Sequence, residues 1–125
     1  GLTRDTNIAD ITKATLESII FLSKDLLEAM KKDNANFNSL MVDGGMVANN
    51  WFCQQLSNIL EIQVRRPKII ETTSLGAGYL AGLHAGVFEN IDSLKSYKQI
   101  DETFNPLKES NRYKEWKGAV EKVLT

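Results

Sequence analysis

A short apolar run that ends in two glycines is the feature that most restricts the fold of this chain. Leu40–Val42 is followed directly by Asp43, Gly44 and Gly45. An apolar run of this kind, bounded by a turn signal, is typical of a buried strand that ends in a tight turn. The next apolar residues follow helical spacing, at Val47, Trp51, Leu56, Ile59 and Leu60. The sequence therefore predicts a strand, a glycine turn and a helix in immediate succession.

The residues before this strand predict a long amphipathic helix from about 8 to 32. Its apolar residues recur in steps of three and four, at Ile8, Ile11, Ile19, Leu22, Leu26 and Met30. Asn7 is suited to cap the amino terminus, and Asp10 suits the positive end of the helix dipole. The helix should therefore begin directly after Asn7.

The residues after the second helix predict a second strand and a third helix. Ile62–Val64 alternates like a short strand, which Pro67 ends. Thr72, Thr73 and Ser74 offer caps for a helix that Gly86 closes. Three glycines lie inside this helix, at Gly76, Gly78 and Gly82. Each costs about 1 kcal/mol of helix propensity relative to alanine, so we expect their face to contact another helix or a ligand.

The remaining residues complete an α/β pattern. We interpret 87–109 as a linker with a helical turn near 93–98, and 110–125 as a last helix. Helices that alternate with strands predict a parallel sheet covered by helices. Two short strands leave unpaired edges, however, and stable sheets usually have three or more. We therefore expect further strands upstream of this chain, and marginal stability or self-association of the chain alone.

Composition excludes several classes of partner. Fifteen basic and 16 acidic residues give a formal net charge of -1, which provides no overall field toward nucleic acid or an anionic membrane. The first residues lack the order of a signal peptide, and no apolar stretch is long enough to span a bilayer. A single cysteine, Cys53, forms no intrachain disulfide. We expect a cytoplasmic protein.

The glycine turn is the strongest chemical signal. Backbone N–H groups without a neighbouring Cβ can approach a phosphate or a nucleoside closely, and a helix amino terminus favours negative charge. An ordinary strand-to-helix turn explains the same residues, and residue chemistry alone leaves both interpretations open. Gly76–Ala81 matches a loose dinucleotide fingerprint, but it lies within a predicted helix rather than after a strand. We assign it to helix packing.

Other reactive residues form no predicted centre. His84 and Cys53 lie on different predicted helices without an acidic cluster, so neither zinc nor thiol chemistry is indicated. Cys53 is interpreted as a small core residue. Arg65 and Arg66 could clamp an anion, although basic pairs are common on protein surfaces. The aromatic residues Trp51, Tyr113 and Trp116 are interpreted as packing residues.

Three groups of residues match one known pattern. The first is Gly1-Leu2, Asp10-Ile11 and Ala14-Thr15-Leu16-Glu17. The second is Asp43 to Asn50, Arg66-Pro67, Glu71 and Thr72 to Gly82, and the third is Arg112-Tyr113 with Trp116. In these residues the chain resembles the FGGY family of carbohydrate kinases, and the glycerol kinases within it, over essentially its whole length.

The resemblance implies part of a ribonuclease-H-like domain of the actin, hexokinase and Hsp70 type. Three strands that open such a domain would lie upstream, and this chain would supply helix, strand, helix, strand, helix and a carboxyl-terminal helix. Residues 1–86 would be the nucleotide-side core. Glu17, although part of the pattern, is interpreted as structural.

The resemblance also implies a nucleotide site. Gly45 and Asn49 match the family's nucleotide contacts, while Asp43 and Gly44 shape the turn. ATP or ADP with Mg²⁺ would bind in the complete enzyme. The catalytic base and the glycerol-binding residues would lie in the rest of the kinase chain, so no catalytic residue or metal ligand is assigned here.

Three hypotheses follow from the sequence. The first is a piece of an ATP-dependent glycerol kinase that is inactive alone. The second is a truncated or split-gene remnant that acts only as a nucleotide-binding or interaction module. The third is a structural α/β fragment without a ligand.

Overall fold

The computed structural model describes residues 1–97, 99–107 and 111–124. In chain order the elements are α1 (Ile8–Lys32), β1 (Ser39–Met41), the 3₁₀ helix η1 (Gly45–Ala48), α2 (Asn50–Leu60), β2 (Gln63–Pro67), α3 (Thr72–His84), α4 (Ile91–Leu94), the 3₁₀ helix η2 (Lys95–Tyr97), β3 (Ile100–Phe104) and α5 (Arg112–Leu124). This order confirms the predicted α/β class. Positions 110 and 125 of the predicted last helix lie outside the described residues.

Helix α1 begins and ends where the sequence predicts. The Asn7 side chain accepts hydrogen bonds from the backbone N–H groups of Ala9 and Asp10, at 2.8 and 3.2 Å. The Asp10 carboxylate in turn accepts from the Asn7 backbone N–H at 3.1 Å. This reciprocal capping box satisfies donors that a helix amino terminus otherwise leaves unpaired. It fixes the start of α1 at Ile8.

The sheet has three strands in the order β1-β2-β3. Strand β1 pairs parallel with β2, and Leu40 lies opposite Val64. Strand β3 pairs antiparallel with β2, and Phe104 lies opposite Val64 from the other side. The prediction of a linker without a strand at 87–109 was wrong in this respect. Among the described residues, the outer edge of β1 has no strand partner.

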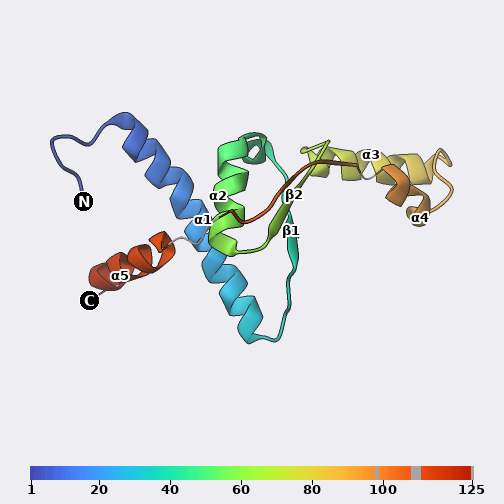
Figure 1. The fold of residues 1–125 in the computed structure, drawn as a ribbon. Helices are drawn as coiled ribbons and strands as arrows, with labels where there is room; N and C mark the ends of the chain where they lie inside the picture. Colours follow the sequence, from blue (N-terminus) through green and yellow to red (C-terminus); the bar gives the residue numbers. More distant parts are fainter. Residues whose placement is uncertain (98, 108–110, 125) are drawn as a thin grey trace.

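Helix α2 is the centre of the core. It packs against β2 and β3 on one side and against α1 on the other, as Figure 1 shows in green between the blue helix and the strands. The buried apolar residues come from these four elements, from η1 and from the connection between α2 and β2: Ile20, Phe21, Leu27, Val47, Phe52, Cys53, Leu56, Ile59, Leu60, Ile62, Val64 and Phe104. Burial of each large side chain contributes about 1.5–3 kcal/mol. Cys53 is fully buried, as predicted for a small core residue.

Helix α3 has no buried residue, although it is apolar. Figure 1 shows α3 and α4 at the end of the molecule that lies away from both termini. Of the three α3 glycines, only Gly82 has a close neighbour, because a Cβ there would collide with the ring of Phe88. Gly76 and Gly78 face open space. Phe88 lies in the connection between α3 and α4, so within the described residues no α3 glycine contacts another helix.

The predicted caps of α3 were wrong. Glu71 occupies the cap position and no side chain there accepts a capping hydrogen bond. The Thr72 hydroxyl instead donates to the Asp43 carboxylate, and the Ser74 hydroxyl donates to the Glu71 carbonyl at 3.1 Å. The Thr72 hydroxyl therefore bonds to the turn after β1 instead of capping α3. Capping preferences concern only neighbouring residues, so they cannot predict this long-range contact.

Helix α5 docks on α1 through aromatic rings and ion pairs. The rings of Phe21 and Trp116 stack with centroids 5.4 Å apart, and the Tyr113 hydroxyl donates to Asp25 at 2.6 Å. Glu17, whose side chain is buried, pairs with Arg112 at 2.7 Å. These contacts agree with the structural roles predicted for Glu17, Tyr113 and Trp116.

The helices of the described residues were also compared with the length and hydropathy that a membrane span requires. None of them meets both requirements.

We expect acid to weaken the docking of α5 on α1. The hydrogen bond from Tyr113 lowers the pKa of Asp25, against an opposite effect of partial burial and with help from Lys117. A carboxylate whose pKa is lower in the folded state stabilises the fold above its unfolded pKa of about 3.9, and the stabilisation is lost as the pH falls. In a Trp51→Phe background, Trp116 fluorescence should therefore change as the pH falls below about 4.

The Asp25→Asn variant is the control for this titration, because its side chain carries no titrating proton. It should dock α5 less firmly at neutral pH and lose the acid-dependent step. Identical titration curves for the variant and the parent would contradict the assignment to Asp25.

Candidate functional site

The predicted turn follows β1 and lies at the carboxyl ends of the parallel strands β1 and β2. Beyond β1, the Val42 backbone N–H donates to the Arg65 carbonyl at 3.1 Å, and the Gly44 N–H donates to the Ile70 carbonyl at 2.7 Å. The first contact extends the pairing with β2, and the second reaches the connection between β2 and α3. In open α/β sheets, ligands bind at the carboxyl ends of parallel strands. The turn lies at such an edge.

Gly44 has a backbone conformation that only glycine adopts readily. Its φ of 85° and ψ of 171° lie in a region where any Cβ meets its own backbone. The adjacent Asp43 is held by the Thr72 hydroxyl at the start of α3. Asp43 therefore contacts the start of α3, and Gly44 contacts the connection between β2 and α3. The role of both residues in shaping a nucleotide site stays a prediction.

Gly45 and Asn49 lie at the two ends of the next segment, and both are exposed. Gly45 begins η1, and a Cβ at Gly45 would meet no atom within 4 Å. Asn49 caps α2, because its side-chain oxygen accepts from the Phe52 N–H at 3.2 Å. The expectation of an α-helix starting directly after the glycines was wrong. A 3₁₀ turn comes first, and α2 begins only at Asn50.

The capping role determines which hydrogen-bonding groups of the Asn49 side chain remain available for a ligand. An asparagine amide has an acceptor oxygen and two N–H donors, and the cap uses only the oxygen. Within the described ranges the amide nitrogen has no hydrogen-bond partner, and the side chain faces solvent. Asn49 can therefore donate to a ligand while it continues to cap α2.

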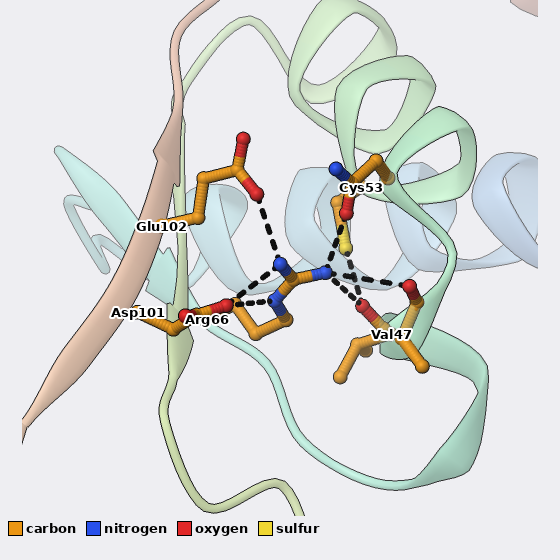
Figure 2. A network of polar contacts seen from close by, with 7 residues as sticks. Val47, Cys53, Arg66, Asp101 and Glu102 are labelled. Atoms are coloured by element: carbon orange, nitrogen blue, oxygen red, sulfur yellow. Dashed lines mark hydrogen bonds and ion pairs between the residues drawn. The ribbon is translucent and has the colours of Figure 1, made fainter.

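A buried guanidinium lies behind this segment. Figure 2 shows Arg66 between the η1 backbone on one side and two carboxylates on the other. Its Nη1 donates to the Val47 carbonyl at 3.0 Å and to Asn50 Oδ1 at 2.7 Å. Its Nε and Nη2 donate to Asp101 Oδ2 at 3.0 and 2.7 Å, and Nη2 also donates to Glu102 Oε2 at 2.9 Å. The Arg66 side chain is 10% exposed.

Arg66 is therefore not an anion clamp on the surface. Two carboxylates already balance its charge, and a third anion would have to displace one of them. Arg65 precedes it on β2, and neighbouring residues of a strand point to opposite faces. The two arginines do not converge on one ligand, so the suggested anion clamp was wrong.

Cys53 forms a second hydrogen bond to the η1 backbone that Arg66 contacts. Its Sγ donates to the Val47 carbonyl at 3.2 Å, so this oxygen accepts from both Cys53 and Arg66. Burial raises the pKa of the Cys53 thiol, and the nearby Arg66 charge only partly offsets this. The thiol stays protonated at neutral pH, as a hydrogen-bond donor must.

A large apolar cavity lies beside the turn but does not include it. Its volume is about 850 Å³, and it is bounded by the ends of β1 and β2 and by α3, α4 and η2. Met41 and Thr72 line it, together with the aromatic residues Tyr79 and Tyr97, whereas Gly44, Gly45 and Asn49 do not. Its walls provide few polar groups to orient a nucleotide. The exposed turn is therefore the better candidate for a nucleotide site.

The described residues contain no group of three His, Cys, Asp or Glu side chains that could hold a metal ion. His84 lies exposed in the last turn of α3, whereas Cys53 is in the core. Asp43, the carboxylate nearest the turn, accepts from Thr72. These residues do not provide a metal centre of their own.

Sequence reasoning missed the two acidic residues that bind Arg66 behind η1. Asp101 and Glu102 lie on β3, within the segment interpreted as a linker. Glu102 occupies the face of β3 that also carries Ile100 and Phe104, and it interrupts what would otherwise read as apolar alternation. The one available signal was the pair of acidic residues near a β-branched and aromatic stretch, which is too weak to assign contacts.

Comparison with known proteins gives one consistent result. Residues 1–85 match the FGGY family of carbohydrate kinases, C-terminal domain. The chain is 46% identical over 129 residues to a glycerol kinase of Marinomonas sp. (strain MWYL1) and 47% identical over 128 residues to one of Haloferax volcanii. These alignments cover 100% and 99% of this chain but 26% and 25% of the relatives. The chain thus spans about a quarter of their length.

Solved structures give the same fold. A crystal structure of Plasmodium falciparum glycerol kinase with ADP superposes with a TM-score of 0.79 at 32% identity, covering 100% of this chain and 26% of that one. A ligand-bound xylulose kinase from Lactobacillus acidophilus gives 0.66 at 24% identity, covering 85% of this chain and 22% of that one. These likenesses confirm the predicted assignment to part of a ribonuclease-H-like domain.

The two adjacent glycines should respond differently to alanine. Gly44→Ala should lower the free energy of unfolding by about 1–3 kcal/mol, because alanine is strained at the backbone angles of Gly44. Gly45→Ala should change it by less than about 0.5 kcal/mol, because the added Cβ meets open space. Urea denaturation of the two variants measures the difference. Equal destabilisation would contradict the conformations described for this turn.

Proposed function

Because this chain belongs to the FGGY family of carbohydrate kinases, we propose that it forms the carboxyl-terminal, nucleotide-binding part of an ATP-dependent glycerol kinase. The complete enzyme would convert glycerol and ATP to sn-glycerol 3-phosphate and ADP. The observation that carries the proposal is the exposed pair Gly45 and Asn49, which lies in the segment after the turn, at the carboxyl edge of two parallel strands.

Each residue of the turn has a distinct proposed role. Gly45 lets the adenosine part of the nucleotide approach the backbone, because no side chain stands in the way. The free amide nitrogen of Asn49 donates a hydrogen bond to an acceptor on the adenosine. Asp43 and Gly44 hold the turn against α3 and touch no ligand. The similarity to a glycerol kinase solved with ADP supports a nucleotide as the ligand.

The chemistry of phosphoryl transfer is assigned to the rest of the kinase chain. Phosphoryl transfer needs a base for the attacking hydroxyl, and Mg²⁺ with donors to balance phosphate charge. The described residues include no metal-binding cluster, so Mg²⁺ would enter with the nucleotide phosphates. We place the reaction in the cytoplasm, where ATP is supplied and a single cysteine such as Cys53 stays reduced.

A chimeric kinase tests the proposed function directly. Residues 1–125 would replace the matching quarter of the Marinomonas glycerol kinase, to which they are 46% identical. We expect the chimera to phosphorylate glycerol with ATP, and we expect the 125-residue chain alone to be inactive. A folded chimera that binds ADP without turnover would favour the non-catalytic module, and full activity of the chain alone would contradict the division of roles.

Substitutions in the chimera test the two nucleotide contacts. Gly45→Val should raise the KM for ATP by about tenfold or more, because two methyl groups enter the space proposed for adenosine. Asn49→Asp should raise it about five- to tenfold, because it removes the N–H donors but keeps the capping oxygen. The KM for glycerol should not change in either variant. Steady-state kinetics measure both constants.

Thermal melting of the same variants separates binding from folding. Asn49→Asp should keep the melting temperature of the parent, whereas Asn49→Ala should lose a cap worth about 1 kcal/mol. Unchanged KM values for ATP in Gly45→Val and Asn49→Asp would refute the assignment of this turn.

A further inference from the structure

We propose that Arg66 is a positioning residue for the nucleotide site, which holds the segment Gly45–Asn49 in its binding geometry without touching the nucleotide. This inference rests on the proposed function. It assigns a role in nucleotide affinity to Arg66 and, through it, to Asp101 and Glu102 on β3.

The contacts of Arg66 lie on both sides of Asn49. Before Asn49, Nη1 donates to the Val47 carbonyl at 3.0 Å and reaches the Ala48 carbonyl at 3.5 Å. After Asn49, Nη1 donates to Asn50 Oδ1 at 2.7 Å. One nitrogen therefore fixes the residues immediately before and after the proposed nucleotide contact. Figure 2 shows these bonds converging on a single corner of the guanidinium.

The segment depends on such an external contact. A 3₁₀ helix has poorer hydrogen-bond geometry than an α-helix, and η1 is only four residues long. The bonds that tie its two ends to the flanking residues are Val47 N–H to the Gly44 carbonyl and Asn49 N–H to the Met46 carbonyl, both at 3.2 Å. Cys53 provides a further contact, but a thiol is a weak donor. Charge-assisted bonds from Arg66 are the strongest contacts that the segment makes.

The opposite side of the guanidinium is fixed by β3. Asp101 accepts from Nε and Nη2 through the same carboxylate oxygen, and Glu102 accepts from Nη2. A buried charge is tolerated only when it is paired and fully hydrogen-bonded, and here the two acidic residues satisfy that need. The Phe104 ring centroid lies 5.6 Å from the guanidinium carbon. The orientation of Arg66, and with it the segment, is thus set by β3.

Lysine cannot replace arginine at this position. A guanidinium presents its donors in a planar fork that can bridge carboxylates on one side and carbonyls on the other. A lysine ammonium is a compact point charge, and it cannot reach both sets at once. Arg66→Lys therefore keeps the charge and removes the bridge.

The test compares Arg66→Lys with Arg65→Lys in the chimeric kinase. Arg65 is the matched control, because it lies on the same strand and its side chain points to the other face. Arg66→Lys should raise the KM for ATP about five- to tenfold, leave the KM for glycerol unchanged and keep kcat within about twofold. Arg65→Lys should change none of the three. A purely structural role would instead lower the active fraction and hence kcat, with both KM values unchanged.

A second measurement is the direct binding of ADP to the chimeric kinase. In isothermal titration calorimetry, Arg66→Lys should weaken ADP binding about five- to tenfold, whereas Arg65→Lys should leave it unchanged. Asp101→Asn should act in the same direction as Arg66→Lys but less strongly, because an amide oxygen can still accept from the guanidinium.

The outcomes separate this inference from the function on which it rests. If Gly45→Val raises the KM for ATP but Arg66→Lys leaves it unchanged, the positioning role is wrong and the nucleotide site stands. If none of these variants changes the KM for ATP or the affinity for ADP, or if the parent chimera binds no nucleotide, both proposals fail.

Discussion

Parallel pairing of β1 with β2 is the constraint on which the candidate site depends. It brings the carboxyl ends of both strands to the same edge, where Gly44 donates to the Ile70 carbonyl and Thr72 donates to Asp43. A displacement of β1 by one residue would move the Gly44 N–H away from the Ile70 carbonyl, and it would turn the Asp43 side chain to the opposite face. The pairing of β1 with β2 therefore sets the position of the turn. Contacts with Ile70 and with Thr72 at the start of α3 then hold its shape.

The proposed contacts and the supporting residues differ in their surroundings. Gly45 and Asn49 are exposed, and they add little to the hydrophobic core. Val47, Cys53 and Arg66 are buried directly behind them. This arrangement lets the contact residues be tested by substitution with limited effect on folding. The proposed contact residues thus lie directly beside buried residues of the core.

The sequence predicted the local elements well and the long-range contacts poorly. Helix α1, the turn at Asp43 to Gly45 and the end of β2 at Pro67 follow from periodicity, capping and proline chemistry, which act within a few residues. Strand β3 was missed because Glu102 interrupts its apolar alternation. That glutamate is tolerated only because Arg66, 36 positions earlier in the chain, lies beside it. The same separation hid the role of Arg66.

A crystal structure of the chimeric kinase with ADP is the most direct test of the central claim, that the turn binds the nucleotide. The account predicts that the adenosine lies against Gly45 and accepts a hydrogen bond from the amide nitrogen of Asn49, whose oxygen still caps α2. ADP bound elsewhere, for example in the cavity between α3 and α4, with Asn49 facing only solvent, would contradict it.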